Sequence, residues 1–309
     1  MCIRDRYTTY KNFNNKYKFE VGARLSYHLH SAVKTVRTVN HFNNEFVNPS
    51  FSLGVSRDFS PLLSLSLNTG VTNRAPQISE LYIEGVHQGV ASLEYGDPNL
   101  NSETSYKTTF KVDYTPNSKL SFQALSYFNP FDDYIYLKPN GDSLLTIRGQ
   151  YPQFYYSQND VLIYGLDFSG IYKLYDNLTF QLKYAYLRGQ DLDNDIPLIY
   201  MSPNNASFHI NYNFKDLGVF KSNKLGFNTV HTFKQNRFVL DQDYVEPPEA
   251  FTLLGIDLSS HIEIKKQQLN FSFTVDNLLN TNYRSYLNRL RYFADEPGMN
   301  MSFRLGYQF

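Results

Sequence analysis

The alternation of apolar and polar residues over long segments constrains this chain more than any other feature of its sequence. In the last eleven residues, from Met299 to Phe309, every second residue is apolar and those between are polar or glycine. Because successive side chains of a strand point to opposite faces, this pattern predicts a strand with one apolar and one polar face. Taken alone, the segment would fit a half-buried strand of a soluble β-sandwich equally well.

The same alternation recurs in about twelve segments, most of them longer than the roughly 5–6 residues typical of strands in soluble proteins. A further short segment, Tyr7–Tyr10, has the character of a strand end. Short turns, such as Asp176–Asn177, alternate with long polar connections. We expect loops at 30–45, 73–103, 138–157, 190–203, 235–249 and 279–298. Short turns at one end and long loops at the other are typical of outer-membrane β-barrels.

Composition favours such a barrel over other classes. The mean hydropathy of −0.43 is too low for a helical membrane protein, and no run approaches the ~20 apolar residues of a spanning helix. A barrel needs an apolar residue only at every second position. The 26 Tyr and 25 Phe fit aromatic girdles at the membrane surfaces, or cross-strand aromatic pairs. The balance of 29 basic and 29 acidic residues gives no indication of nucleic-acid binding.

No arrangement of residues predicts catalysis, so we expect neither an enzyme nor a cofactor. The seven histidines are scattered, and the single cysteine excludes an internal disulfide. Asp191, Asp193 and Asp195 lack the glycine and distal glutamate of a calcium loop, so a solvated acidic loop is the better interpretation. Residues 1–6 interrupt the pattern and are expected not to be native to the chain, which leaves 7–309 as one barrel portion.

Several motifs resemble those of TonB-dependent outer-membrane receptors. A mid-barrel signature is carried by Asn73-Arg74-Ala75-Pro76, Glu80-Leu81, Gly85-Val86-His87, Gly96-Asp97-Pro98-Asn99-Leu100 and Glu103. A closing signature is carried by Val275 to Asn280, Tyr283, Pro297-Gly298 and the terminal Phe309, and Tyr164-Gly165-Leu166-Asp167 is similar to the start of a family strand. Each motif is modest alone, but their order and spacing span nearly the whole chain.

The resemblance implies an antiparallel transmembrane β-barrel of about 22 strands around a plug domain, of which this chain would supply about twelve strands and no plug. It implies active uptake of a scarce ligand, such as a ferric siderophore, haem or a metal ion, across the outer membrane of a Gram-negative bacterium. The implied partners are membrane lipid, the transported ligand, the TonB complex through a missing N-terminal region, and the barrel-assembly machinery, which would read Phe309. A self-contained twelve-stranded pore or adhesin, or a secreted all-β binding protein, remains an alternative.

One loop carries candidate ligand-binding residues, namely Glu80, Glu84, His87, Glu94 and Asp97. Imidazole and carboxylate groups together suit Zn²⁺ or another transition metal, and His87 with Glu94 is the predicted metal pair. The stretch from Gly85 to Asp97 also resembles the zinc-uptake branch of the same family. A polar surface loop that binds nothing is the competing interpretation.

Overall fold

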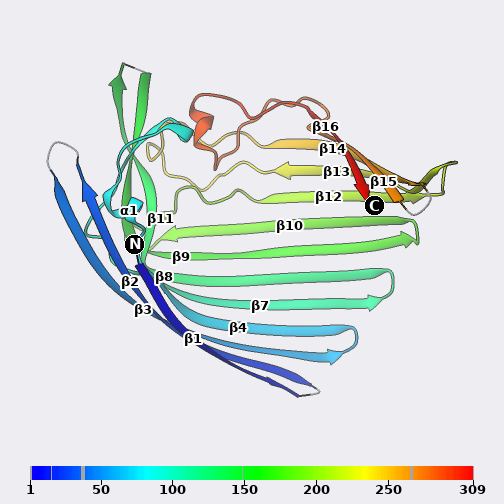
Figure 1. Ribbon diagram of the computed structural model, residues 1–309, viewed down its shortest axis with the longest axis horizontal. Helices are drawn as coiled ribbons and strands as arrows, with labels where there is room; N and C mark the ends of the chain where they lie inside the picture. Colours follow the sequence, from blue (N-terminus) through cyan, green and yellow to red (C-terminus); the bar gives the residue numbers. More distant parts are fainter. Residues whose placement is uncertain (1, 15, 36–38, 148, 265–266, 309) are drawn as a thin grey trace.

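The wall of the protein is a single curved antiparallel sheet (Figure 1). The computed structural model describes residues 2–14, 16–35, 39–147, 149–264 and 267–308. Thirteen strands follow one another along the wall in sequence order. They are β1 (Cys2–Phe13), β2 (Tyr17–Lys34), β3 (Asn40–Ser60), β4 (Leu63–Arg74), β7 (Glu103–Asn117), β8 (Leu120–Thr146), β9 (Gly149–Tyr175), β10 (Leu178–Asp191), β12 (Asn205–Phe214), β13 (Phe220–Thr232), β14 (Phe251–Ile264), β15 (Gln267–Asp276) and β16 (Asn300–Gln308).

The remaining elements lie in the long connections. They are α1 (Ile78–Tyr82), β5 (Glu84–His87), η1 (Gln88–Val90), β6 (Ser92–Tyr95), β11 (Ile196–Pro197) and η2 (Arg289–Tyr292). β5 and β6 form a small hairpin whose second strand runs parallel to β9, and β11 pairs with β10. Within the described residues, no helix is long and apolar enough to cross a membrane.

The predicted all-β wall is confirmed, with more strands than expected. The sheet has sixteen strands in the described ranges, because β5, β6 and β11 join the thirteen of the wall. The expected stub at Tyr7–Tyr10 is part of β1, which begins at Cys2 and pairs with β2 along its whole length. Asp5 there forms a 2.9 Å ion pair with Arg24. The non-native origin of residues 1–6 stays a prediction.

Two expected loops are largely strand. Residues 138–146 belong to β8 and 149–157 to β9, with pairing that continues to Thr146 and Gly149, and residues 30–34 and 40–45 belong to β2 and β3. Polar residues misled the prediction here because a hairpin that extends past the rest of the wall has water on both faces and needs no apolar side. Cross-strand backbone pairing is enough to extend it.

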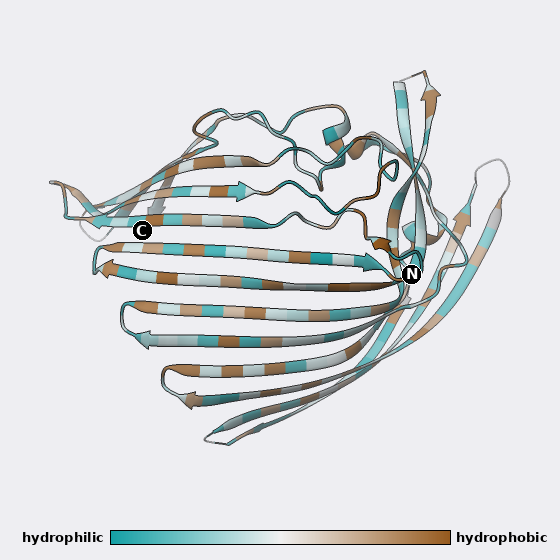
Figure 2. Ribbon diagram, turned by 180° about the vertical axis from the view of Figure 1, so that it is seen from behind, coloured by the Kyte–Doolittle hydropathy of each residue, from teal (hydrophilic) through white to brown (hydrophobic). Residues whose placement is uncertain are grey.

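Alternation along each strand sorts the residues between the two faces, as Figure 2 illustrates by the hydropathy bands on the ribbons. On β2, Leu25 is 55 % exposed whereas its neighbour Ser26 is 5 % exposed. The same exposed face carries Phe51 on β3, Leu182 on β10 and Leu258 on β14. No second sheet covers this apolar face in the part of the chain that the structure describes. A β-sandwich is therefore excluded, and we call the apolar side the outer face and the opposite side the inner face.

A small apolar core lies where the long connections meet the inner face. Leu81, Leu100 and Ile135 form it, and Phe46, Tyr82 and Tyr156 pack against it. The core joins α1 and the following loop to strands β3, β8 and β9. It fixes the segment between β4 and β7, which contains all five candidate ligand-binding residues.

Candidate functional site

An ion-pair network anchors the segment between β4 and β7. Arg74, the last residue of β4, binds Glu80 of α1 at 2.9 Å and Glu103, the first residue of β7, at 3.1 Å. Glu80 also accepts a hydrogen bond from the backbone N–H of Gln77, and Glu103 accepts one from that of Ile135. Both carboxylates are almost buried, at 12 % and 10 % side-chain exposure. One guanidinium therefore pairs with both carboxylates and closes the loop at its base.

Gly96 lets the returning chain approach α1 closely. Its N–H donates to the carbonyl of Ile83, and the N–H of Asp97 donates to the carbonyl of Glu80. A Cβ on Gly96 would lie 2.6–2.7 Å from backbone atoms of Leu81, Glu80 and Tyr82. The mid-barrel signature is thus a set of packing and hydrogen-bonding residues that hold this loop in place.

The structure brings together two of the five predicted ligand-binding residues. His87 at the end of β5 and Glu94 on β6 lie with Nδ1 3.0 Å from Oε1. The other three have separate partners: Glu80 binds Arg74, Glu84 binds Lys34, and Asp97 caps the N–H of Asn99. Among the described residues, no group of three or more His, Cys, Asp or Glu side chains is placed to hold a metal ion.

Glu94 also connects this hairpin to the last long loop. Its side chain is 4 % exposed and forms a 2.8 Å ion pair with Arg289 of η2, while His87 is 51 % exposed. The Arg289 guanidinium lies over the ring of Phe154, which is fully buried on β9. His87 is therefore the solvent-facing end of a chain of contacts that reaches η2 through Glu94.

A second network, which the sequence did not predict, joins three long loops around Asp243. This carboxylate accepts hydrogen bonds from Arg291, from the hydroxyl of Tyr292 at 2.5 Å and from the hydroxyl of Tyr200 at 3.3 Å. The Arg291 side chain is 1 % exposed and stacks against Tyr286 and Tyr292. We call Asp243, Arg291, Tyr200, Tyr286 and Tyr292 the loop hub. These residues are too widely separated in polar loops for any spacing rule to group them.

Burial determines the electrostatics of the loop hub. It raises the pKa of both Tyr200 and Tyr292, and the Asp243 carboxylate raises them further. The pKa of Tyr286 is raised by burial as well. The hub therefore contains one compensated charge pair, Arg291 with Asp243, surrounded by neutral phenols that can donate hydrogen bonds but do not ionise in the ordinary pH range.

The β8–β9 hairpin is tied to the same region by Tyr244. Its hydroxyl oxygen lies 2.6 Å from the carbonyl oxygens of both Asp142 and Gln153, either of which can accept its single proton, and its ring packs against Phe154. The ring of Tyr292 also packs against Phe154. The loops at 235–249 and 279–298, the hairpin β5–β6 and the projecting β8–β9 hairpin thus form one connected surface.

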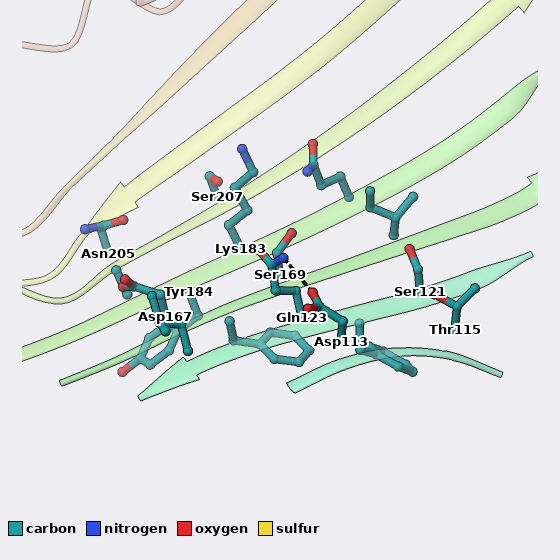
Figure 3. Close-up of a pocket in the computed structure, with 16 residues that line it drawn as sticks. Asp113, Thr115, Ser121, Gln123, Asp167, Ser169, Lys183, Tyr184, Asn205 and Ser207 are labelled. Atoms are coloured by element: carbon teal, nitrogen blue, oxygen red, sulfur yellow. Dashed lines mark hydrogen bonds between the residues drawn. The ribbon is translucent and has the colours of Figure 1, made fainter. Parts of the chain in front are cut away.

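A separate hollow of about 710 Å³, lined by both polar and apolar side chains, lies along the wall from β7 to β12 (Figure 3). Gln123 donates a 2.8 Å hydrogen bond to Asp113 there, and Asp167 and Lys183 line the same space. It contains none of the predicted ligand-binding residues.

The acidic loop around Asp191 also differs from a calcium site, because Asp191 is buried and bonded to Tyr136, Asn159 and Asn194. Phe309, the predicted assembly signal, lies outside the described residues.

Comparisons with known proteins agree with this architecture. Residues 4–278 match the family model described as TonB dependent receptor-like, beta-barrel. The copper transporter OprC aligns with a TM-score of 0.81 at 18 % identity, over 99 % of this chain and 47 % of that one. The ferric citrate transporter FecA aligns with a TM-score of 0.71 at 14 % identity, over 99 % and 44 %. The FrpB iron transporter from Neisseria meningitidis gives 0.68 at 14 % identity, over 99 % and 44 %.

Because the sequence identities are low, these structural similarities support the fold alone. The chain spans less than half the length of each of these proteins. The family match covers most of the chain, including the mid-barrel signature and the wall from β1 to β15. The chain belongs to the family of TonB-dependent receptors and carries part of their β-barrel.

Proposed function

We propose that this chain forms part of an outer-membrane receptor that takes up a scarce ligand, such as a ferric siderophore, haem or a metal ion, by TonB-dependent active transport. The proposal rests most directly on the wall, whose apolar outer face suits hydrocarbon, combined with long loops gathered at one end. The solved structures of similar fold include proteins described as a copper transporter and as iron transporters. TonB and membrane lipid are the partners that this function requires.

The connected loop surface is the proposed place of ligand contact. His87 is the exposed group on the β5–β6 hairpin, and Glu94 behind it bonds Arg289 of the last loop. A ligand that binds the imidazole of His87 would compete with Glu94 for its Nδ1 and so alter the contact to η2. This gives a physical route from a ligand on the hairpin to a change in the position of the loop at 279–298.

Uptake by cells tests the proposed function. A Gram-negative strain that expresses the complete receptor gene is expected to accumulate the ligand only while the inner-membrane proton gradient is intact. A protonophore should abolish accumulation without reducing binding at the cell surface. Accumulation that is unchanged by the protonophore would favour the passive pore. Surface attachment without uptake would favour an adhesin.

The proposed ligand contact has its own test. His87→Ala is expected to weaken ligand binding to the purified receptor, and a metal-protection assay would detect a bound ion directly. His209→Ala, on the wall strand β12, is the matched control. Unchanged affinity in His87→Ala would remove His87 from the ligand site while leaving the transport proposal standing.

A further inference from the structure

Two histidines on β2 occupy the inner face of the wall outside the loop surface described above. His28 and His30 are two residues apart on one strand, so their side chains point to the same side. Their ring centroids are 6.1 Å apart. Their neighbours on β3 are Phe46, paired with His28, and Asn44, paired with His30. Phe46 packs against the core beneath α1, so this pair lies where the wall meets the β4–β7 segment.

Four buried polar side-chain atoms on the inner faces of β2 and β3 have no hydrogen-bond partner within the residues that the structure describes. His30 is 1 % exposed, and neither of its ring nitrogens has a hydrogen-bond partner among the described residues. Asn48 on β3 is also 1 % exposed, and both polar atoms of its amide lack partners. These two side chains account for four of the six such buried atoms in the described part of the chain. An unpaired buried polar group costs about 1–3 kcal/mol, so the two unpaired ring nitrogens of His30, beside the ring of His28, point to a ligand for them.

The hydrogen bonds of His28 determine which of its nitrogens is available. Ser26 donates its hydroxyl proton to the carbonyl of Asn48 at 3.4 Å, and the same hydroxyl oxygen lies 3.3 Å from Nε2 of His28. We assign the ring proton of His28 to Nε2, so that the hydroxyl oxygen of Ser26 accepts from it. The lone pair of His28 is then on Nδ1. This arrangement, in which an outer partner fixes the tautomer of a histidine, is the one found behind metal-binding imidazoles.

We propose that His28 and His30 bind a late first-row transition-metal ion between their free ring nitrogens. Imidazole suits copper, nickel and zinc, and copper(II) binds nitrogen ligands most strongly of the three. Two imidazoles leave coordination positions for water or for other small ligands. The site is distinct from His87 and Glu94, and it does not depend on the proposed transport function.

Copper(II) titration of the full chain, without an affinity tag and in detergent, tests this site. Electron paramagnetic resonance should show one tightly bound ion with splitting from two imidazole nitrogens. His28→Ala and His30→Ala are each expected to weaken binding by about tenfold or more, since even loss of an outer partner costs 10–100-fold. His231→Ala, which removes a histidine bonded to Thr252 on a distant strand, should change nothing.

A gain of affinity gives an independent check. The ring of Phe46 lies 5.5 Å from that of His30 and pairs with His28, so Phe46→His would add a third imidazole and should tighten copper binding. For any variant that does not fold, the unchanged protein decides the question: bound copper should protect His28 from diethyl pyrocarbonate. Copper binding that survives both alanine substitutions, depends on His87, or leaves His28 unprotected would overturn the proposal.

Discussion

Replacement of Arg74 by methionine tests the ion-pair network at the base of the β4–β7 segment. The substitution keeps much of the side-chain length but leaves the carboxylates of Glu80 and Glu103 without their cation, at 12 % and 10 % exposure. Removing one partner of a largely buried pair costs about 3–5 kcal/mol. Because Arg74 is itself 37 % exposed and each carboxylate keeps one backbone donor, we expect about 3 kcal/mol.

Hydrogen exchange on the protein in detergent provides the assay. About 3 kcal/mol corresponds to roughly a hundredfold increase in the local opening of the segment between α1 and β6. The amides of Leu81, Gly96 and Asp97, which bond backbone carbonyls of this segment, should exchange faster by that factor. The amides of β13 and β14 should not change.

Two controls separate lost charge compensation from a general effect of mutation. Lys18→Met breaks an exposed ion pair with Asp58 and should leave the exchange of these amides unchanged. Adding Glu80→Gln and Glu103→Gln to Arg74→Met removes the uncompensated charges and should restore part of the protection. Equal exchange in Arg74→Met and the wild type would refute the reasoning, as would a triple variant less protected than the single one.

Three further predictions concern the loops. Gly96→Ala places a Cβ 2.6–2.7 Å from the backbone of α1 and should destabilise the segment by about 2 kcal/mol. Gly89→Ala, whose Cβ would have no neighbour nearer than 3.9 Å, should be tolerated. Equal rates of urea-dependent proteolysis in the two variants would contradict this prediction. Asp243→Asn leaves Arg291 buried without its counter-charge, at a local cost of about 3 kcal/mol, and should expose the loop at 235–249 to protease. Asp216→Asn, which changes an exposed ion pair with Lys221, should have little effect. Equal cleavage of the two variants would count against the loop hub. Burial raises the pKa of Tyr200 and Tyr292 above the ordinary tyrosine value near 10, so as the pH rises these phenols ionise first in the opened loops. Loop stability should therefore be full below about pH 10 and fall above it. Tyr292→Phe should make that fall shallower, and an unchanged pH profile of protease resistance would show that the phenol does not titrate in this way.

Alternation predicted the wall because a single sheet with one apolar and one polar face requires it. Leu25 and Ser26 illustrate the point, since their opposite exposures follow from their positions alone. The mid-barrel signature likewise placed Arg74 and Gly96 in a common loop. The sequence did not show which glutamates of this loop bind a ligand and which bind an arginine, because the two kinds cannot be distinguished in the sequence alone.

Long-range contacts account for the other failures. Lys138 to Ser157 looks like a loop because polar residues dominate it, yet pairing between β8 and β9 makes most of it strand. Asp243 meets Arg291 and Tyr200 across more than forty residues of chain in each direction. Such a meeting depends on how the wall curves and where each loop returns, which no local pattern records.

Tryptophan scanning across one strand tests the central claim that the apolar outer face contacts hydrocarbon. The chain has no tryptophan, so each single substitution gives one fluorescence signal. In vesicles of brominated lipid, Leu166→Trp and Leu182→Trp on the outer face should be strongly quenched. Asp167→Trp and Lys183→Trp, beside them in sequence but lining the inner hollow, should be quenched little. Equal quenching within each neighbouring pair would contradict the membrane wall and the receptor function built on it.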